Sequence, residues 1–453
     1  MAVLDGSIAN TALPTIAREL GASPTASIWV VNAFQLAVTA SLLAFAALGQ
    51  LRGPARVYRV GVIAFVAGSL ACALAHSLPL LIAARAFQGL GASAIMAISP
   101  AILREIFPRA QLGHALGLNA LVVATSSAAG PTLGGLILAV LPWPWLFALN
   151  VPFGLANIAL NRALPPDDER RPGWLDFPSV LTSALGIALT VWGLDGFARQ
   201  EPPWSIALRL LVGLSSTAYF VRRQFTLPQP MIALDLFRAP TFAFAGATSF
   251  ASFVAQGLAF VALPFFFQVA LGCTPLESGL LLTAWPLAVA VVAPFSGRLS
   301  DRVPVGILAT TGLTVFTAGL ALYATLPQNP TAVRIVLDGI ICGLGFGFFQ
   351  SPNNRDLIGS APREKSASAG GLLAVIRVGG QTGGVALVAI VFGLFGASVA
   401  AGGATAHGAV THAAPVVLSL ACAFAALATL ISALRLRTLY TSSGSVEFPR
   451  SRR

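Results

Sequence analysis

Long blocks of apolar residues recur along the whole chain and restrict its fold more than any other feature of the sequence. Examples are 28–48, 60–75, 280–295 and 414–434, and each approaches the roughly 20 residues that an α-helix needs to cross a bilayer. Hydrophobic residues make up 56% of the chain and charged residues only 9%, whereas about a quarter of the residues of a soluble domain are charged. Because so few charges cannot cover a water-exposed surface, we expect an all-α polytopic membrane protein in a lipid bilayer.

Charge clusters and turns rich in Gly, Pro or Asn divide these blocks into thirteen predicted spans. A shorter apolar segment, 1–17, comes before them and lacks the charged start of a signal peptide. We interpret it as the second half of a truncated first helix, which makes fourteen helices the expected number. The predicted spans are 27–48, 57–76, 79–103, 112–140, 143–164, 173–198, 203–221, 241–271, 276–300, 304–326, 331–358, 366–396 and 413–435.

Two related turns, half a chain apart, indicate an internal repeat. Residues 46–53 read AALGQLRG after the second helix, and 297–304 read GRLSDRVP after the tenth. Equivalent turns are typical of transporters built from two parallel six-helix repeats. We therefore expect an N-terminal six-helix bundle over 1–164, two linking helices over 165–235, a second six-helix bundle over 236–440 and a cytoplasmic tail over 441–453.

The basic residues predict how the chain is oriented in the membrane. If the N-terminus is inside, 21 of the 27 Lys and Arg residues fall on the even-numbered connections and the C-terminus. Because Lys and Arg concentrate on cytoplasmic loops, we expect both termini in the cytoplasm. The net charge of +11 is spread singly or in pairs between apolar spans, which favours loop-edge charge over a nucleic-acid partner. Arg-rich, Ala-rich and nearly Lys-free usage indicates a bacterium with GC-rich DNA, and hence the bacterial inner membrane.

Several short motifs combine charged or polar residues with glycine and proline inside the apolar spans. They read LDGSIANTALP at 4–14, RAFQGLGA at 85–92, SSAAGPTLGG at 126–135 and WLFALNVPFG at 145–154. These motifs resemble those of the fourteen-helix drug:proton antiporter branch of the major facilitator superfamily, the EmrB/QacA type, and the resemblance extends over nearly the whole chain. It implies the major facilitator fold, with two six-helix bundles and two extra central helices.

Three charged side chains inside the spans are candidates for proton coupling. A carboxylate within a span is costly and is usually functional, so Asp5 is a candidate proton site; the alternative is that it lies at the membrane edge. Arg85 needs a partner or a water-filled cavity, and its permanent charge can promote proton release from a nearby acid; the alternative is an arginine that snorkels to the extracellular edge. The family resemblance implies a role for Arg85 in proton coupling. Asp338 is a further candidate for a proton or cation site, or else a wetted helix end.

Glycine and proline residues at 126–135 are candidates for a conformational role. Pro131 frees a backbone carbonyl and bends its helix. Gly130, Gly134 and Gly135 leave a groove for a neighbouring helix. The family resemblance associates this motif with exporters rather than importers, and a kinked packing helix is the alternative.

Other polar and aromatic residues are candidates for substrate binding, conformational change or packing. Gln88 and Gly89 belong to the conformational motif of the fourth helix, and Asn10 and Gln88 are candidate substrate-binding residues. Phe34 and other aromatic residues could line a cavity, but their helical spacing in lipid favours packing. We expect Asn353 to cap the end of its helix.

The turns at the two repeats differ in one acidic residue. Asp301 and Arg302 keep the family's Asp-Arg pair, and the resemblance implies that such a pair binds a neighbouring helix end and latches one conformation. In the first copy Gln50 stands at the place of the acid. We therefore expect a weakened or absent latch in the first half.

The sequence also restricts the energy source and the class of activity. No GxxxxGK[ST] phosphate-binding loop occurs and Lys365 is the only lysine, which disfavours an ATP-driven pump. The four histidines are scattered and the four cysteines lack metal-ligand spacing, so we expect no metal, no cofactor and no enzyme active site. We predict a monomeric secondary transporter that exports small amphipathic, drug-like or antibiotic compounds by proton antiport and alternating access. A facilitator-type importer of a small metabolite and an integral-membrane enzyme are the alternatives.

Overall fold

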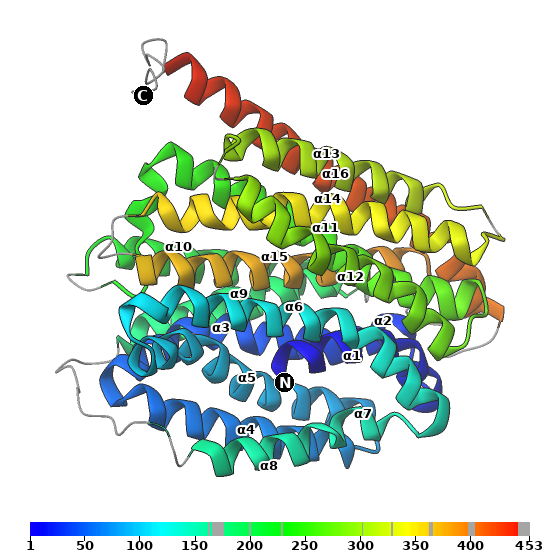
Figure 1. The fold of residues 1–453 in the computed structure, drawn as a ribbon. Coiled ribbons are helices and arrows are strands. Elements are labelled where there is room, and N and C mark those ends of the chain that lie inside the picture. The colour runs from blue at the N-terminus through cyan, green and yellow to red at the C-terminus, as the bar shows by residue number, and fades with distance from the viewer. Residues whose placement is uncertain are drawn as a thin grey trace.

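The structure is a computed structural model that describes residues 1–161, 164, 176–198, 201–227, 230–300, 302–327, 329–361, 366–396 and 404–442. Within these residues every regular element is a helix (Figure 1). Among them, eleven helices are long and apolar enough to cross a membrane, and Thr125–Val140 and Pro144–Leu160 are shorter apolar helical stretches. The predicted all-α polytopic membrane architecture is confirmed.

The helices fall into three groups along the chain. The first group is α1 (Ala2–Glu19), α2 (Pro24–Ser27), α3 (Trp29–Arg52), α4 (Pro54–Ala73), α5 (Leu78–Ile106), α6 (Arg109–Val140), α7 (Pro144–Ala148) and α8 (Asn150–Leu160). The second group is α9 (Phe177–Ala198) and α10 (Pro203–Gln224). The third group is η2 (Leu234–Arg238), α11 (Pro240–Phe265), its π-helical continuation η3 (Phe266–Ala270), α12 (Pro275–Leu299), α13 (Val305–Ala324), α14 (Ala332–Gly359), α15 (Ser366–Leu394) and α16 (Ala404–Ser442).

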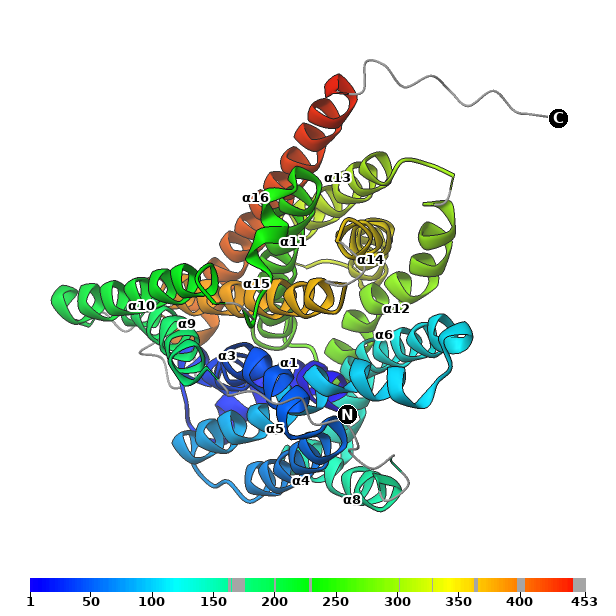
Figure 2. The ribbon, with the colours of Figure 1, turned by 90° about the vertical axis from the view of Figure 1, so that its left-hand side faces the viewer.

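The long helices run back and forth between two ends of the molecule, with α1–α8 in one half and α11–α16 in the other (Figure 1). Helix α9 packs against α3 of the first half and α15 of the second, while α10 lies along α9 at the periphery (Figure 2). We call the end at which α3, α10 and α12 finish the arginine-rich end, because Arg52, Arg222 and Arg298 lie in their last turns. The other end is called the opposite end.

A close backbone approach and one ion pair join α9 to α10. A Cβ at Gly186 would lie 2.4 Å from Thr217 Oγ1, so a side chain at this position would push the helices apart. Arg223 donates two hydrogen bonds to Asp176, from Nε at 2.9 Å and from Nη2 at 2.7 Å. The side-chain hydrogen bond from Arg223 holds the pKa of Asp176, which precedes α9, below its ordinary value. The two linking helices therefore form a paired unit.

Two expectations about helix ends are wrong. The last predicted span begins at 413, but α16 begins at Ala404, so the helix extends before the apolar block that defined the span. Asn353 does not cap a helix end, since α14 continues to Gly359. Its Nδ2 donates to Ser249 Oγ at 2.8 Å and to the Ala245 carbonyl at 3.2 Å, both in α11. The side chain joins two helices in a region where water does not supply hydrogen bonds.

Glycines set the closest approach of α13 and α14 in the second half. A Cβ at Gly345 of α14 would lie 2.2 Å from the backbone nitrogen of Phe316, and one at Gly312 of α13 would lie 2.6 Å from that of Phe349. Van der Waals packing drives helix association in lipid, and small residues permit it. Because backbone atoms cannot rotate away, this interface has no room for a side chain.

Replacing Gly345 by alanine is expected to lower the thermal midpoint of the detergent-purified protein by several degrees. Overpacking of this kind costs roughly 1–3 kcal/mol. Gly359→Ala on the same helix is the matched control, because a Cβ there has no neighbour within 4 Å. Size-exclusion chromatography after heating measures the midpoint, and equal midpoints for the two variants would contradict this description of the interface.

Candidate functional site

Asp5 of α1 lies inside the first half with only 1% of its surface exposed. Three side chains donate to its carboxylate: Arg85 Nη1 to Oδ2 at 2.5 Å, Gln88 Nε2 to Oδ1 at 3.0 Å and Asn150 Nδ2 to Oδ1 at 2.6 Å. A carboxylate removed from water is stable only when it is paired and hydrogen-bonded. The structure therefore brings together three of the predicted site residues, Asp5, Arg85 and Gln88, and adds Asn150. We call these four side chains the Asp5 network.

Arg85 of α5 is enclosed as completely as the carboxylate, with 0% of its surface exposed. Its Nε donates to the Val30 carbonyl at 3.0 Å, and Nη1 also donates to Gln88 Oε1 at 2.6 Å. Its guanidinium carbon lies 4.2 Å from the ring centre of Phe34 and 5.3 Å from that of Phe147, where an aromatic face attracts a cation. Arg85 thus has favourable contacts that do not depend on the charge of the carboxylate.

Glycines bring α5 close enough to α3 and α4 for these contacts to form. A Cβ at Gly89 would lie 2.6 Å from the Phe34 carbonyl oxygen, and one at Gly68 of α4 would lie 2.6 Å from Gln88 Cα. Neither position has room for a side chain, and α5 therefore packs closely against both α3 and α4. Gly89 therefore acts through close packing, which holds Arg85 and Gln88 in the interior.

Three polar residues in or beside this network were not among the predicted site residues. Ser69 Oγ accepts from Gln88 Nε2 at 2.7 Å, and the Cys72 thiol donates to Gln88 Oε1 at 3.6 Å. Asn150 begins α8 directly after a break between α7 and α8. Pro152 accounts for the break, because it has no N–H for the carbonyl four residues earlier. The available signal was the place of Asn150 in the WLFALNVPFG motif, two residues before Pro152, while Ser69 and Cys72 belong to no motif.

Pro131 and two glycines fit α6 against α1. Because Pro131 has no N–H, the Ser127 carbonyl has no partner within the helix, and Ser7 Oγ of α1 donates to it at 3.1 Å. A Cβ at Gly130 would lie 2.4 Å from Ser7 Cβ, and Gly134 faces the same helix. The proline therefore exposes a hydrogen-bond acceptor at a point where α1 approaches closely enough to use it.

The same stretch of α6 contacts α12 of the other half at the opposite end of the molecule. A Cβ at Gly135 would lie 2.6 Å from a backbone oxygen of α12, and one at Gly279 of α12 would lie 2.2 Å from the Pro131 carbonyl oxygen. One turn away, the hydroxyls of Thr132 and Thr283 lie 2.6 Å apart. The two halves are thus in direct backbone contact at this point.

The remaining predicted residues are not part of the Asp5 network. Asp338 of α14 is 1% exposed, and its Oδ2 accepts from Arg334 Nε at 3.0 Å, one turn earlier in the same helix. Asn10 of α1 is half-buried, and its enclosed Oδ1 has no hydrogen-bond partner among the described residues. Arg302 is exposed at the arginine-rich end, whereas Asp301 lies outside the described residues. The roles assigned to these four residues stay predictions.

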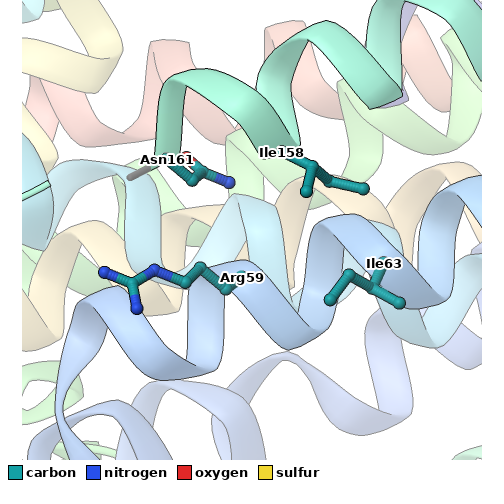
Figure 3. A pocket seen from close by; sticks show the side chains of 4 residues that line it. All are labelled: Arg59, Ile63, Ile158 and Asn161. Carbon is teal, nitrogen blue, oxygen red and sulfur yellow. The ribbon is translucent and has the colours of Figure 1, made fainter. Parts of the chain in front are cut away.

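A surface pocket of about 380 Å³ lies between α4 and α8. Arg59, Ile63, Ile158 and Asn161 line it (Figure 3). Two of its lining side chains are apolar, and no acid contributes to it, so it lacks the paired charges of the Asp5 network. We do not assign it to the functional site.

Part of the Asp5 network does not depend on the charge of the carboxyl group. A proton on Asp5 removes the negative charge that Arg85 holds, while the amides of Gln88 and Asn150 can still donate to a carboxyl oxygen. Arg85 keeps its carbonyl, amide and aromatic contacts, but it loses its counter-charge, and its buried Nη2 has no hydrogen-bond partner among the described residues. The protonated state is therefore costly in this packing.

A helical membrane fold in two halves, with an acid and an arginine paired inside one of them, is the architecture of a membrane transport protein. The family model described as Major Facilitator Superfamily matches residues 1–385, and the chain belongs to this family. It is a multi-pass membrane transporter and not an enzyme.

Curated bacterial transporters are similar to the chain over most of its length. The uncharacterized transporter YebQ of Escherichia coli K12 is 47% identical over 399 residues, which cover 87% of each chain. The riboflavin transporter RibZ of Clostridioides difficile is 32% identical over 383 residues, 83% of this chain and 82% of RibZ. The putative multidrug resistance protein MdtD of Salmonella typhi is 29% identical over 406 residues, 87% of this chain and 84% of MdtD.

A solved structure shares the fold at low sequence identity. It is the crystal structure of a bacterial homologue of the human lysosomal transporter Spinster, in an inward-facing and unoccupied conformation. The TM-score is 0.65 and the identity 15%, with 97% of this chain and 95% of that chain covered. The predicted major facilitator fold is confirmed.

Separating the charges of the buried pair is expected to destabilise the protein strongly. Asp5→Asn leaves the Arg85 charge without a counter-charge in an enclosed site, which costs roughly 3–5 kcal/mol. Arg85→Gln leaves the Asp5 carboxylate without a counter-charge in the same way. The double variant Asp5→Asn/Arg85→Gln is expected to lose less free energy of unfolding than the two single variants together. Reversible unfolding in mixed micelles containing dodecyl sulfate measures these values.

The partly exposed pair of Glu201 and Arg209 is the control for this comparison, with side chains 24% and 19% exposed and 2.5 Å apart. Pairs open to solvent contribute only about 0–1 kcal/mol. Strictly additive losses at Asp5 and Arg85 would show that the two side chains are not coupled.

Proposed function

We propose that this transporter is a proton-coupled antiporter that exports small amphipathic organic compounds across the bacterial inner membrane. The observation that carries the proposal is the enclosed carboxylate of Asp5, held by Arg85, Gln88 and Asn150. Proton binding at Asp5 favours one facing state, because it removes the charge that ties α1 to α5. Binding of the exported compound favours the other state, and the shared equilibrium couples the two fluxes.

Contacts between the halves support alternating access as the mechanism. At the opposite end, Gly135 and Gly279 bring α6 and α12 together, and Gln268 of η3 donates to the Thr11 carbonyl of α1 at 2.7 Å. With both termini in the cytoplasm, as the arginine-rich connections favour, this joined end is extracellular. An interface of backbone surfaces and a few hydrogen bonds can separate while each half moves as a rigid body.

Two independent similarities favour export over import. The residues around Pro131 resemble the motif found in exporters of this family, and MdtD, 29% identical, is named a putative multidrug resistance protein. The second candidate is uptake of a small metabolite, because RibZ, 32% identical, is named a riboflavin transporter. Growth of a riboflavin auxotroph on micromolar riboflavin tests this second candidate directly.

Everted membrane vesicles test the coupling. Respiration acidifies the vesicle lumen, and an antiporter then releases protons when its substrate is added outside. With riboflavin, riboflavin 5′-phosphate and ethidium as probes, at least one is expected to dissipate the pH gradient, measured by recovery of a quenched acridine dye. Asp5→Asn is expected to reduce this response at least tenfold, because the proton site is lost.

Two further variants make the assignment specific. Asp338→Asn is expected to reduce the response less than Asp5→Asn, since Arg334 has a side chain that is 47% exposed and can be solvated when the pair is broken. Arg59→Gln, at an exposed position of α4, is the control and is expected to leave the response unchanged. Probe accumulation that persists after a protonophore collapses the gradient would reject proton coupling.

A further inference from the structure

Arg377 of α15 is a second arginine inside the membrane-spanning part, and the Asp5 network does not use it. It lies within the candidate span Ala369–Leu394 and is half-buried. Its guanidinium makes no hydrogen bond or ion pair with any residue that the structure describes. An ionised side chain inside a membrane protein is costly and is retained where a partner or a water-filled passage stabilises it.

The contacts of α15 show which helices lie around Arg377. Gly380 and Gly384 lie against the backbone of α11, while the Thr382 hydroxyl lies 3.3 Å from that of Thr39 in α3. At 100° per residue, Arg377 points about 40° from the mean direction of Gly380 and Gly384 and about 140° from that of Thr382, and it shares a helix face with Gln381, four residues later. This face of α15 therefore lies on the α11 side of the helix, while Thr382 faces α3 of the other half.

Amide groups continue the polar character of this face. Gln381 Nε2 donates to Gln256 Oε1 of α11 at 2.9 Å, and Gln35 Oε1 of α3 accepts from Thr382 Oγ1 at 3.5 Å. Polar side chains within a span usually line a passage or contact another helix. Arg377 shares its helix face with the amide of Gln381, and a cation that has no acidic partner among the described residues can attract an anion from outside the protein.

Three buried or half-buried acids of the described residues pair with other arginines. Asp5 pairs with Arg85, Asp338 with Arg334 and Asp356 with Arg435. Each of these pairs belongs to a different place in the fold from the Gln381 face of α15. These acids are therefore not partners of Arg377, and its half-buried side chain remains available to a bound anion.

We propose that Arg377 binds an anionic group of the transported compound, a carboxylate or a phosphate. This inference rests on the proposed transport function and names its substrate class as organic anions with an apolar body. The planar guanidinium suits both groups, because it can donate two parallel hydrogen bonds to two oxygens of one anion. The neighbouring amides of Gln381 and Gln256 supply further donors to the same group.

Binding to the purified transporter in detergent tests the proposal without a proton gradient. The probes form two matched pairs: riboflavin 5′-phosphate with riboflavin, and 1-pyrenebutyrate with 1-pyrenebutanol. At least one anionic probe is expected to bind about tenfold or more tightly than its neutral counterpart, as a charge-assisted hydrogen bond implies. Fluorescence titration measures each dissociation constant, and the two pairs distinguish a phosphate from a carboxylate.

Variants at position 377 show whether this arginine is responsible. Arg377→Gln is expected to abolish the preference for the anion while leaving the affinity for the neutral probe unchanged, which also verifies that the variant is folded. Arg377→Lys keeps the charge but not the two parallel donors, and is expected to retain part of the preference. Arg59→Gln, which removes an exposed arginine of α4, is the control.

Two outcomes would overturn the inference, and neither depends on transport. One is failure of both anionic probes to bind at millimolar concentration, and the other is an anion preference unchanged by Arg377→Gln. If vesicles show no proton-coupled flux but Arg377 still determines anion binding, the proposed antiport fails and the binding assignment stands.

Discussion

The pairing of Asp5 with Arg85 in an enclosed site is the interaction on which the first half of the structure depends. Neither charge is stable alone in a membrane interior, and the pair requires α1, α3, α5 and α8 to meet around one point. Gly68 and Gly89 remove the side chains that would hold α3, α4 and α5 apart. The many glycines of the chain are therefore a condition for placing a charged site inside lipid, since the hydrogen bonds form only when the helix backbones nearly touch.

Proline has a related role at two places in this half. Pro131 leaves the Ser127 carbonyl without a helical partner, and Ser7 of α1 supplies the hydrogen bond. Pro152 accounts for the break just before Asn150, which sets this residue at the first turn of α8 with its amide on the carboxylate of Asp5. In both cases a backbone defect yields a polar contact to α1. The helix that carries Asp5 is thus held by groups that local helix geometry leaves unused.

The long apolar blocks predicted the helices well because length and hydropathy alone determine a membrane span. The span predicted at 304–326 is α13, Val305–Ala324. Lone charges such as Asp5 and Arg85 also stood out against an apolar background, whereas Ser69 and Phe34 are neutral residues that occur throughout the chain. Their roles depend on which helices pack together, and a local rule cannot supply that. Asn353 illustrates this, because the helix-cap rule addresses its own helix and its partners lie in α11.

Arg85 and Arg377 show that surroundings, rather than residue type, decide what an intramembrane arginine does. The guanidinium of Arg85 has a carboxylate, an amide, a carbonyl and two aromatic faces around it, so it is held by the Asp5 network. That of Arg377 has no such partners among the described residues. Phe34 lies on Arg85 and belongs to the same buried cluster as Val378, the residue after Arg377. The helices α5 and α15 that carry the two arginines therefore contribute to one packed region around α3, although each guanidinium has different surroundings.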